Sequence, residues 1–152
     1  MRVLYKYTDG SAGDNLGNAI ALDGGTVAVG ALHDDPDGRN DSGSVYIFVD
    51  SGSGWTQQGK LVAEDGSSGA RLGRSVALSG DSVISGSERK NGCQGAAYVF
   101  ARSGMIWSQE AKLLPADVGS GDYFGVSVGI DGDTAVVGSF GDDDRGADAG
   151  AA

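Results

Sequence analysis

Short apolar runs alternate with glycine, serine and aspartate along the chain, and one such pattern occurs three times. It reads LGNAIALDGGTVAVGA from Leu16, LGRSVALSGDSVISGS from Leu72 and FGVSVGIDGDTAVVGS from Phe124. Equivalent glycines recur after 56 and then 52 residues, and a fixed period of this kind is typical of repeat architectures. The chain is therefore interpreted as one domain of repeats, whose units span about residues 16–71, 72–123 and 124–152.

Each complete unit contains four short apolar runs, which predict four strands. In the second unit the expected strands are Gly73–Leu78, Ser82–Gly86, Ala96–Ala101 and Trp107–Leu114. The Gly and Asp residues between the first two strands predict tight hairpin turns, because both residue types tolerate positive φ. Runs such as VYIFV lack alternation, which indicates sheets covered on both faces. Four-stranded antiparallel sheets that cover one another form β-propeller blades, so we predict an all-β propeller fold with almost no helix.

Aromatic residues recur at equivalent positions in the first two units. We expect four of them to be largely buried: Tyr46, Phe48, Tyr98 and Phe100. Trp55 and Trp107 could stack on sugars, but their repetition at one structural position favours packing between blades.

Composition and charge exclude several classes of partner. The chain has 28 glycines and a net charge of −10, from 21 acidic and 11 basic residues, so attraction to nucleic acid or anionic lipid is not expected. No apolar run reaches the roughly 20 residues of a membrane span, and the first residues lack the apolar stretch of a secretory signal. We therefore expect no membrane insertion. The single cysteine excludes an internal disulfide.

The repeated motifs carry a family resemblance. Phe124-Gly125, the VGA or VGS that ends the second strand, and the GSVYIF or GAAYVF that opens the third resemble FG-GAP repeats over nearly the whole chain. Such repeats build the propellers of integrin α chains and of many bacterial surface and secreted proteins. The resemblance implies a non-catalytic module for protein interaction or adhesion, in an extracellular or cell-surface location. The integrin calcium loop between strands one and two is absent, because LDGGT, LSGDS and IDGDT are too short to wrap an ion.

Aspartates cluster instead after the second strand of two units, in LHDDPDGRNDSG and FGDDDRGADAG. Alternate acids with a glycine bend bring several oxygens toward a hard cation, so these loops are candidate calcium sites. The candidate ligands are Asp35, Asp37 and Asp41 in the first loop, and Asp142, Asp144 and Asp148 in the second. The same composition is equally expected of a solvated loop in which Asp and Gly make turns.

In an antiparallel blade, the loop between strands two and three emerges on the same face as the connection to the next blade. The acidic loops and the Gly/Ser-rich connections AEDGSSGAR and ADVGSGDY should share this face, which engages ligands in integrin-like propellers. A negative face suits a basic ligand or a partner bridged by a cation. Three functions stay open: a protein-interaction module, a carbohydrate-binding propeller, and a purely structural part of a larger propeller.

Catalysis is disfavoured. His33, the only histidine, lies in an acidic loop, and no serine or cysteine has a nucleophile-elbow motif around it.

The repeat count predicts self-association. Residues 1–8 resemble a fourth strand, and Ala151-Ala152 would begin a third strand. Three units are too few for a closed ring, and open sheet edges invite pairing. We expect a homo-oligomer, namely a two-fold dimer forming six blades, in which residues 1–8 of one subunit help to complete the unfinished blade of the next. Excision from a longer chain is the alternative.

Overall fold

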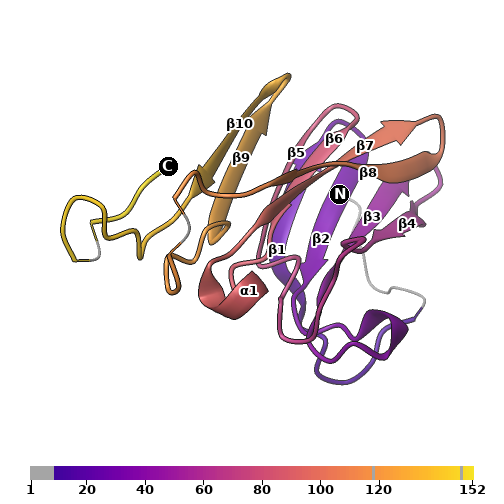
Figure 1. Ribbon diagram of the computed structural model, residues 1–152. Coiled ribbons are helices and arrows are strands. Elements are labelled where there is room, and N and C mark those ends of the chain that lie inside the picture. Colours follow the sequence, from indigo (N-terminus) through magenta and orange to yellow (C-terminus); the bar gives the residue numbers. More distant parts are fainter. Residues whose placement is uncertain (1–8, 118, 148) are drawn as a thin grey trace.

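The computed structural model describes residues 9–117, 119–147 and 149–152, and its regular structure is almost entirely antiparallel β-sheet (Figure 1). Two sheets have four strands each, in the orders β1-β2-β3-β4 and β5-β6-β7-β8, and a third sheet pairs β9 with β10. The first sheet comprises β1 (Leu16–Asp23), β2 (Thr26–Ala31), β3 (Ser44–Asp50) and β4 (Trp55–Leu61). The second comprises β5 (Ser75–Ser79), β6 (Ser82–Gly86), β7 (Ala97–Ser103) and β8 (Ile106–Leu113). The third comprises β9 (Ser127–Asp131) and β10 (Thr134–Gly138).

The expected all-β class with four-stranded antiparallel sheets is confirmed, whereas closure into a ring stays a prediction. Each predicted strand of the second unit overlaps the observed one, with ends that differ by at most two residues. The first two strands of every unit are joined by two-residue turns, and Gly24, Gly80 and Gly132 have φ of +55°, +56° and +53° there. The helical residues in the described part of the chain are the short α1 (Lys90–Cys93) and the 3₁₀ turn Pro36–Gly38.

Successive sheets pack face to face, with β5 lying between β1 and β9 (Figure 1). One apolar cluster joins the first two sheets and contains Ala28, Val45, Val83 and Phe100. Another joins the second and third sheets through Ile84, Val128 and Ile130. The faces of the inner strands are therefore covered on both sides, which is why their sequences lack alternation.

The four aromatic side chains expected in the core are buried: Tyr46, Phe48, Tyr98 and Phe100 are each at most 1% exposed. Trp107 packs between the first two sheets and donates a hydrogen bond of 2.8 Å from Nε1 to Gln58 Oε1. The Arg102 guanidinium lies 5.2 Å from the ring of Trp107. The interpretation of this tryptophan as a packing residue is confirmed.

Candidate ligand-binding face

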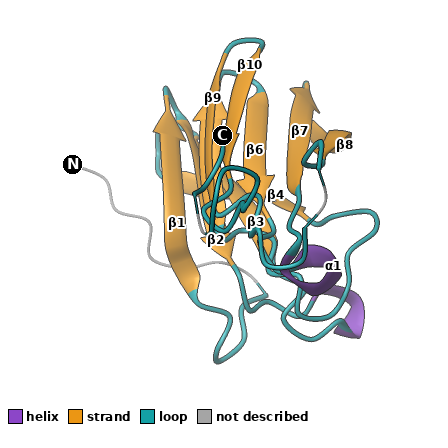
Figure 2. Ribbon diagram, turned by 60° about the vertical axis from the view of Figure 1, so that its left-hand side comes forward, coloured by secondary structure: helices purple, strands orange, loops and turns teal. Residues whose placement is uncertain are grey.

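The long loops gather at one end of the sheets, together with α1 (Figure 2). The loop between β2 and β3 lies against the connection from β4 to β5, because Gly69 N donates to Asn40 O at 2.8 Å and Leu72 N to Ser42 O at 2.9 Å. The same contact recurs one repeat later, where Tyr123 N donates to Cys93 O at 2.9 Å. The two classes of loop share one face, as expected from the strand order.

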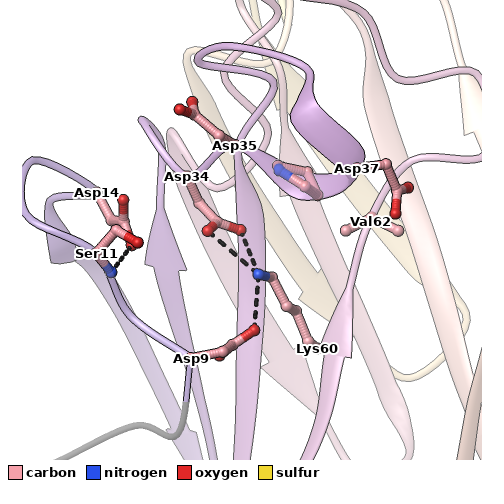
Figure 3. Close-up of a pocket in the computed structure, with 9 residues that line it drawn as sticks. Asp9, Ser11, Asp14, Asp34, Asp35, Asp37, Lys60 and Val62 are labelled. Carbon is pink, nitrogen blue, oxygen red and sulfur yellow. Dashed lines mark hydrogen bonds and ion pairs between the residues drawn. The ribbon is translucent and has the colours of Figure 1, made fainter.

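A hollow of about 460 Å³ opens on this face in the first repeat (Figure 3). Five aspartates and a single lysine give its lining a strongly negative formal charge. The lining residues are Asp9, Ser11, Asp14, Asp34, Asp35, Pro36, Asp37, Lys60 and Val62. We call this hollow the acidic pocket.

Lys60 forms the centre of the acidic pocket. Its Nζ lies 2.8 Å from Asp34 Oδ2 and 3.0 Å from Asp9 Oδ2 (Figure 3). The register of β3 and β4 places Lys60 opposite Tyr46, and Nζ lies 5.1 Å from the centre of that ring. Asp34 is buried, so it depends on this ammonium for its charge compensation.

Burial and hydrogen bonding shift the pKa values of both Lys60 and Tyr46. For Lys60, burial favours the neutral amine, but hydrogen bonds with Asp34, Tyr46 and Asp9 raise its pKa above the ordinary lysine value. Burial raises the pKa of Tyr46 to about 12, although the hydrogen bond with Lys60 opposes this. Lys60 is thus charged throughout the physiological range, and its single positive charge is shared by two of the five aspartates.

The three calcium ligands predicted in the first loop lie beside separate protein partners. Asp35 Oδ1 accepts a hydrogen bond of 2.7 Å from the backbone N of Asp41. Asp41 Oδ1 in turn lies 2.7 Å from His33 Nδ1. Asp37 forms an ion pair of 2.6 Å with Arg39. The structure therefore does not gather these carboxylates into a cluster of three among the residues it describes, and their role as calcium ligands stays a prediction.

The second repeat reverses the charge of the equivalent loop position, because Lys90 stands where the first repeat has Asp34. Lys112 Nζ lies 2.7 Å from Asp65 Oδ2, and Tyr98 donates a hydrogen bond of 2.7 Å to Asp65 Oδ1. Lys90 Nζ lies 3.4 Å from Asp65 Oδ2 and also contacts the Asp65 carbonyl oxygen. Burial raises the pKa of Asp65, but hydrogen bonds from Lys112 and Tyr98 and the nearby lysine charges lower it to about 2.

This shift predicts a contribution to acid stability. Asp65 has a folded pKa of about 2 against an ordinary value of 3.8, so its contribution is complete above the ordinary value and is lost as the pH falls toward 2. Urea unfolding at a series of pH values should show the native chain losing more stability over this window than Asp65→Asn does. Because Asp65 is half-exposed, solvent screening reduces the difference below what the pKa shift alone would give. Parallel pH profiles of the two proteins would contradict the assignment.

Three acids come together where the connection from β8 to β9 meets the loop after β10. Asp117, Asp142 and Asp144 each place a carboxylate oxygen within 4.8 Å of the other two, at a hollow of about 410 Å³. A side-chain hydrogen bond with Asp117 raises the pKa of Asp144 and lowers that of Asp117. Of the ligands predicted in the second loop, Asp142 and Asp144 are therefore brought together, while Asp148 lies outside the described residues. This trio is where the described residues could hold a hard cation, and calcium stays a prediction for it.

Asp117 was missed by the sequence reasoning, although a signal for it exists. Asp9, Asp65 and Asp117 each stand eight residues before the first glycine of a repeat motif. Such a position is visible in an alignment of the three units, but its pairing with the loop after the second strand requires the fold. Lys60 was missed for the same reason.

Comparison with models of protein families gives a match over most of the chain. A family model described as FG-GAP repeat matches residues 7–48, 55–100 and 107–152. No curated protein matches the sequence. Within the described residues, no helix has the length and apolar character needed to cross a membrane.

Proposed function

Because the chain belongs to the FG-GAP repeat family, we propose that it is a binding module whose acidic pocket takes a basic segment of a partner protein. FG-GAP repeats suggest a β-propeller-type interaction module, and the family is generally non-enzymatic. The observation that carries the proposal is the acidic pocket itself, in which five aspartates surround one lysine. A lysine or arginine side chain entering it would meet a lining that has four more aspartates than lysines.

Three of these carboxylates are suited to such a ligand. Lys60 pairs with Asp9 and Asp34, and the lining has three further aspartates, namely Asp14, Asp35 and Asp37. Asp37 is more than half exposed and pairs with Arg39 at the surface, where an incoming guanidinium can compete for it.

Direct binding measurements test this proposal. A lysine decapeptide should bind the native chain with a salt-dependent affinity, and a glutamate decapeptide should not bind. A triple Asp→Asn variant at Asp14, Asp35 and Asp37 keeps oxygen acceptors for the local hydrogen bonds but removes three charges. We expect it to weaken binding about tenfold, because each exposed pair contributes up to about 1 kcal/mol.

The matched control removes the same charge at the opposite, hairpin end of the sheets. It replaces Asp50, Asp131 and Asp133 by Asn, residues in or beside the β3–β4 and β9–β10 turns. This variant should bind the lysine peptide like the native chain. Equal losses in the two triple variants would show that only net charge matters, and would contradict a site at the acidic pocket.

Carbohydrate binding is a second candidate, favoured by one observation. Tyr123 and Phe140 stack with ring centroids 4.9 Å apart, and Phe140 is 56% exposed on the loop face. An exposed aromatic surface of this kind supports sugar stacking. A glycan array with Phe140→Ala as control separates this candidate from the first, since the lysine peptide does not require Phe140.

A further inference from the structure

Among the residues that the structure describes, the first and the third sheet each have one face without another sheet against it. The junctions between the sheets inside the molecule indicate what fits these faces. In the first sheet, Ile20 and Leu22 on β1 are 64% and 65% exposed. Their equivalents in the other two sheets pack against the preceding sheet. These equivalents are Val76 and Leu78 on β5, and Val128 and Ile130 on β9. The β1 side chains are thus placed as at a junction, but no sheet of the described residues packs against them.

The third sheet, at the other end of the row of sheets, also exposes an apolar side chain (Figure 1). Val136 on β10 is 54% exposed, whereas its equivalents Ala28 and Ile84 are fully buried against the following sheet. The three residues occupy equivalent places in their own strands. The greater exposure of Val136 therefore reflects the place of its sheet at the end of the row.

Glycines that have no room for a Cβ lie at the same junctions between sheets. A Cβ on Gly30 would lie 2.1 Å from Gly73 O, and a Cβ on Gly86 would lie 1.7 Å from Gly125 O, so glycine lets adjacent sheets touch through their backbones. The third unit keeps glycine at the equivalent Gly138, where the three atoms nearest to a Cβ all belong to Ser127 of the same sheet. At the other end Gly17, the equivalent of Gly73, has φ of +96° and nothing within 4 Å of a Cβ.

We propose that these two faces bind each other in two copies of the chain. The first-sheet face (Gly17, Ile20, Leu22) of one copy docks on the third-sheet face (Val136, Gly138, Gly150) of the other, in the geometry of the internal junctions. The interface is head to tail, and a second, identical junction closes the two copies into a two-fold pair. Ile20, Leu22 and Val136 then lose their exposed apolar surface to an apolar partner.

Charge supports the same arrangement. Gly150, a member of the third-sheet face, also lines the hollow of Asp117, Asp142 and Asp144. The aspartates equivalent to Asp117, which are Asp9 and Asp65, each pair with a lysine ammonium, from Lys60 or Lys112. Residues 1–8, which lead into the first-sheet face and lie outside the described residues, contain Arg2 and Lys6 and no acid. The sequence next to the first-sheet face thus carries positive charge, which is complementary to the acidic trio beside the third-sheet face.

Analytical ultracentrifugation of the full chain tests the proposal. The native chain should sediment at twice its 15.3 kDa mass at micromolar concentration. Ile20→Asp and Val136→Asp should each sediment as a monomer, because a charge would be buried without a partner at both junctions. Both side chains are exposed within one chain, so each variant should keep its circular dichroism spectrum. Met105→Asp is the matched control: Met105 is 77% exposed on the β7–β8 turn, away from both faces, and this variant should still form the pair.

Mixing the two monomeric variants tests the direction of the contact. Val136→Asp keeps an intact first-sheet face and Ile20→Asp keeps an intact third-sheet face, so the mixture should form a heterodimer through one good junction. Asp142→Asn and Lys6→Gln should each weaken the native pair and its salt dependence, whereas Asp35→Asn should not. A native chain that is monomeric up to about 100 µM, a concentration that favours even weak pairs, would overturn the proposal. A mixture that stays monomeric would overturn the head-to-tail contact.

Discussion

Replacing Lys60 by methionine is expected to lower the free energy of unfolding by about 3 kcal/mol, the cost of leaving a buried charge without its partner. Methionine keeps the length and the apolar stem of the side chain, so the loss comes from the ammonium and not from packing. Asp34 is the cause: its side chain is 6% exposed, and Lys60 Nζ lies 2.8 Å from its Oδ2. Urea unfolding followed by fluorescence measures the effect.

The repeat supplies a matched control for this variant. Lys112 is equivalent to Lys60, but its partner Asp65 is 47% exposed and also contacts Lys90 and Tyr98. Lys112→Met should therefore cost less than about 1 kcal/mol, as exposed ion pairs do. The double variant Lys60→Met/Asp34→Asn should recover most of the stability, because no uncompensated charge is left in the interior. Equal costs for the two lysine variants would contradict the role given to Asp34.

Strands and turns were predictable from the sequence because local signals determine them. The apolar run from Ser82 to Gly86 is bounded by glycine turns, and the observed β6 has those same bounds. The two-residue turns follow from the need for positive φ at Gly24, Gly80 and Gly132. Burial of the aromatic residues followed from runs without alternation, since such runs require cover on both faces.

Other features depend on the register between strands, which the sequence pattern leaves open. The pairing of β7 with β8 shifts between Val99 and Phe100, and β3 with β4 shifts at the equivalent place. Nothing in the apolar pattern indicates these irregularities. The acidic pocket depends on the register too, because Lys60 on β4 meets Asp34 only where the β2–β3 loop folds over the strand ends. A loop rich in aspartate therefore predicted negative charge correctly, but not which carboxylates an ammonium would already occupy.

Comparison of the repeats also indicates which cation suits the acidic trio of Asp117, Asp142 and Asp144. Asp9 and Asp34 bind one ammonium in the first repeat, and Asp65 contacts two in the second. The equivalent aspartates Asp9 and Asp65 thus each form an ion pair with a lysine on the fourth strand of a sheet, Lys60 on β4 or Lys112 on β8. Asp117 and Asp142 stand at the same positions, so the chemistry of the fold itself favours an ammonium there.

Gly86→Ala is expected to destabilise the chain by about 3 kcal/mol, the upper end of the usual cost of overpacking. The new Cβ would lie 1.7 Å from the carbonyl oxygen of Gly125, a backbone atom that cannot rotate away, so the second and third sheets must separate. Without this contact alanine in a strand would be neutral or slightly favourable, because it loses less backbone entropy on folding than glycine. Thermal and urea unfolding measure the loss.

Two glycines in the third sheet separate the steric effect from the substitution itself. Gly129 on β9 has nothing within 4 Å of a Cβ, so Gly129→Ala should change the free energy of unfolding by less than about 0.5 kcal/mol. Gly138 is the equivalent of Gly86, but the close atom there is the Ser127 hydroxyl, which belongs to a side chain that can rotate. Gly138→Ala should thus lower the free energy of unfolding of one chain much less than Gly86→Ala does. Its main effect should be to weaken the association of two copies. If Gly86→Ala unfolded like Gly129→Ala, the sheets would not be joined through these two backbones.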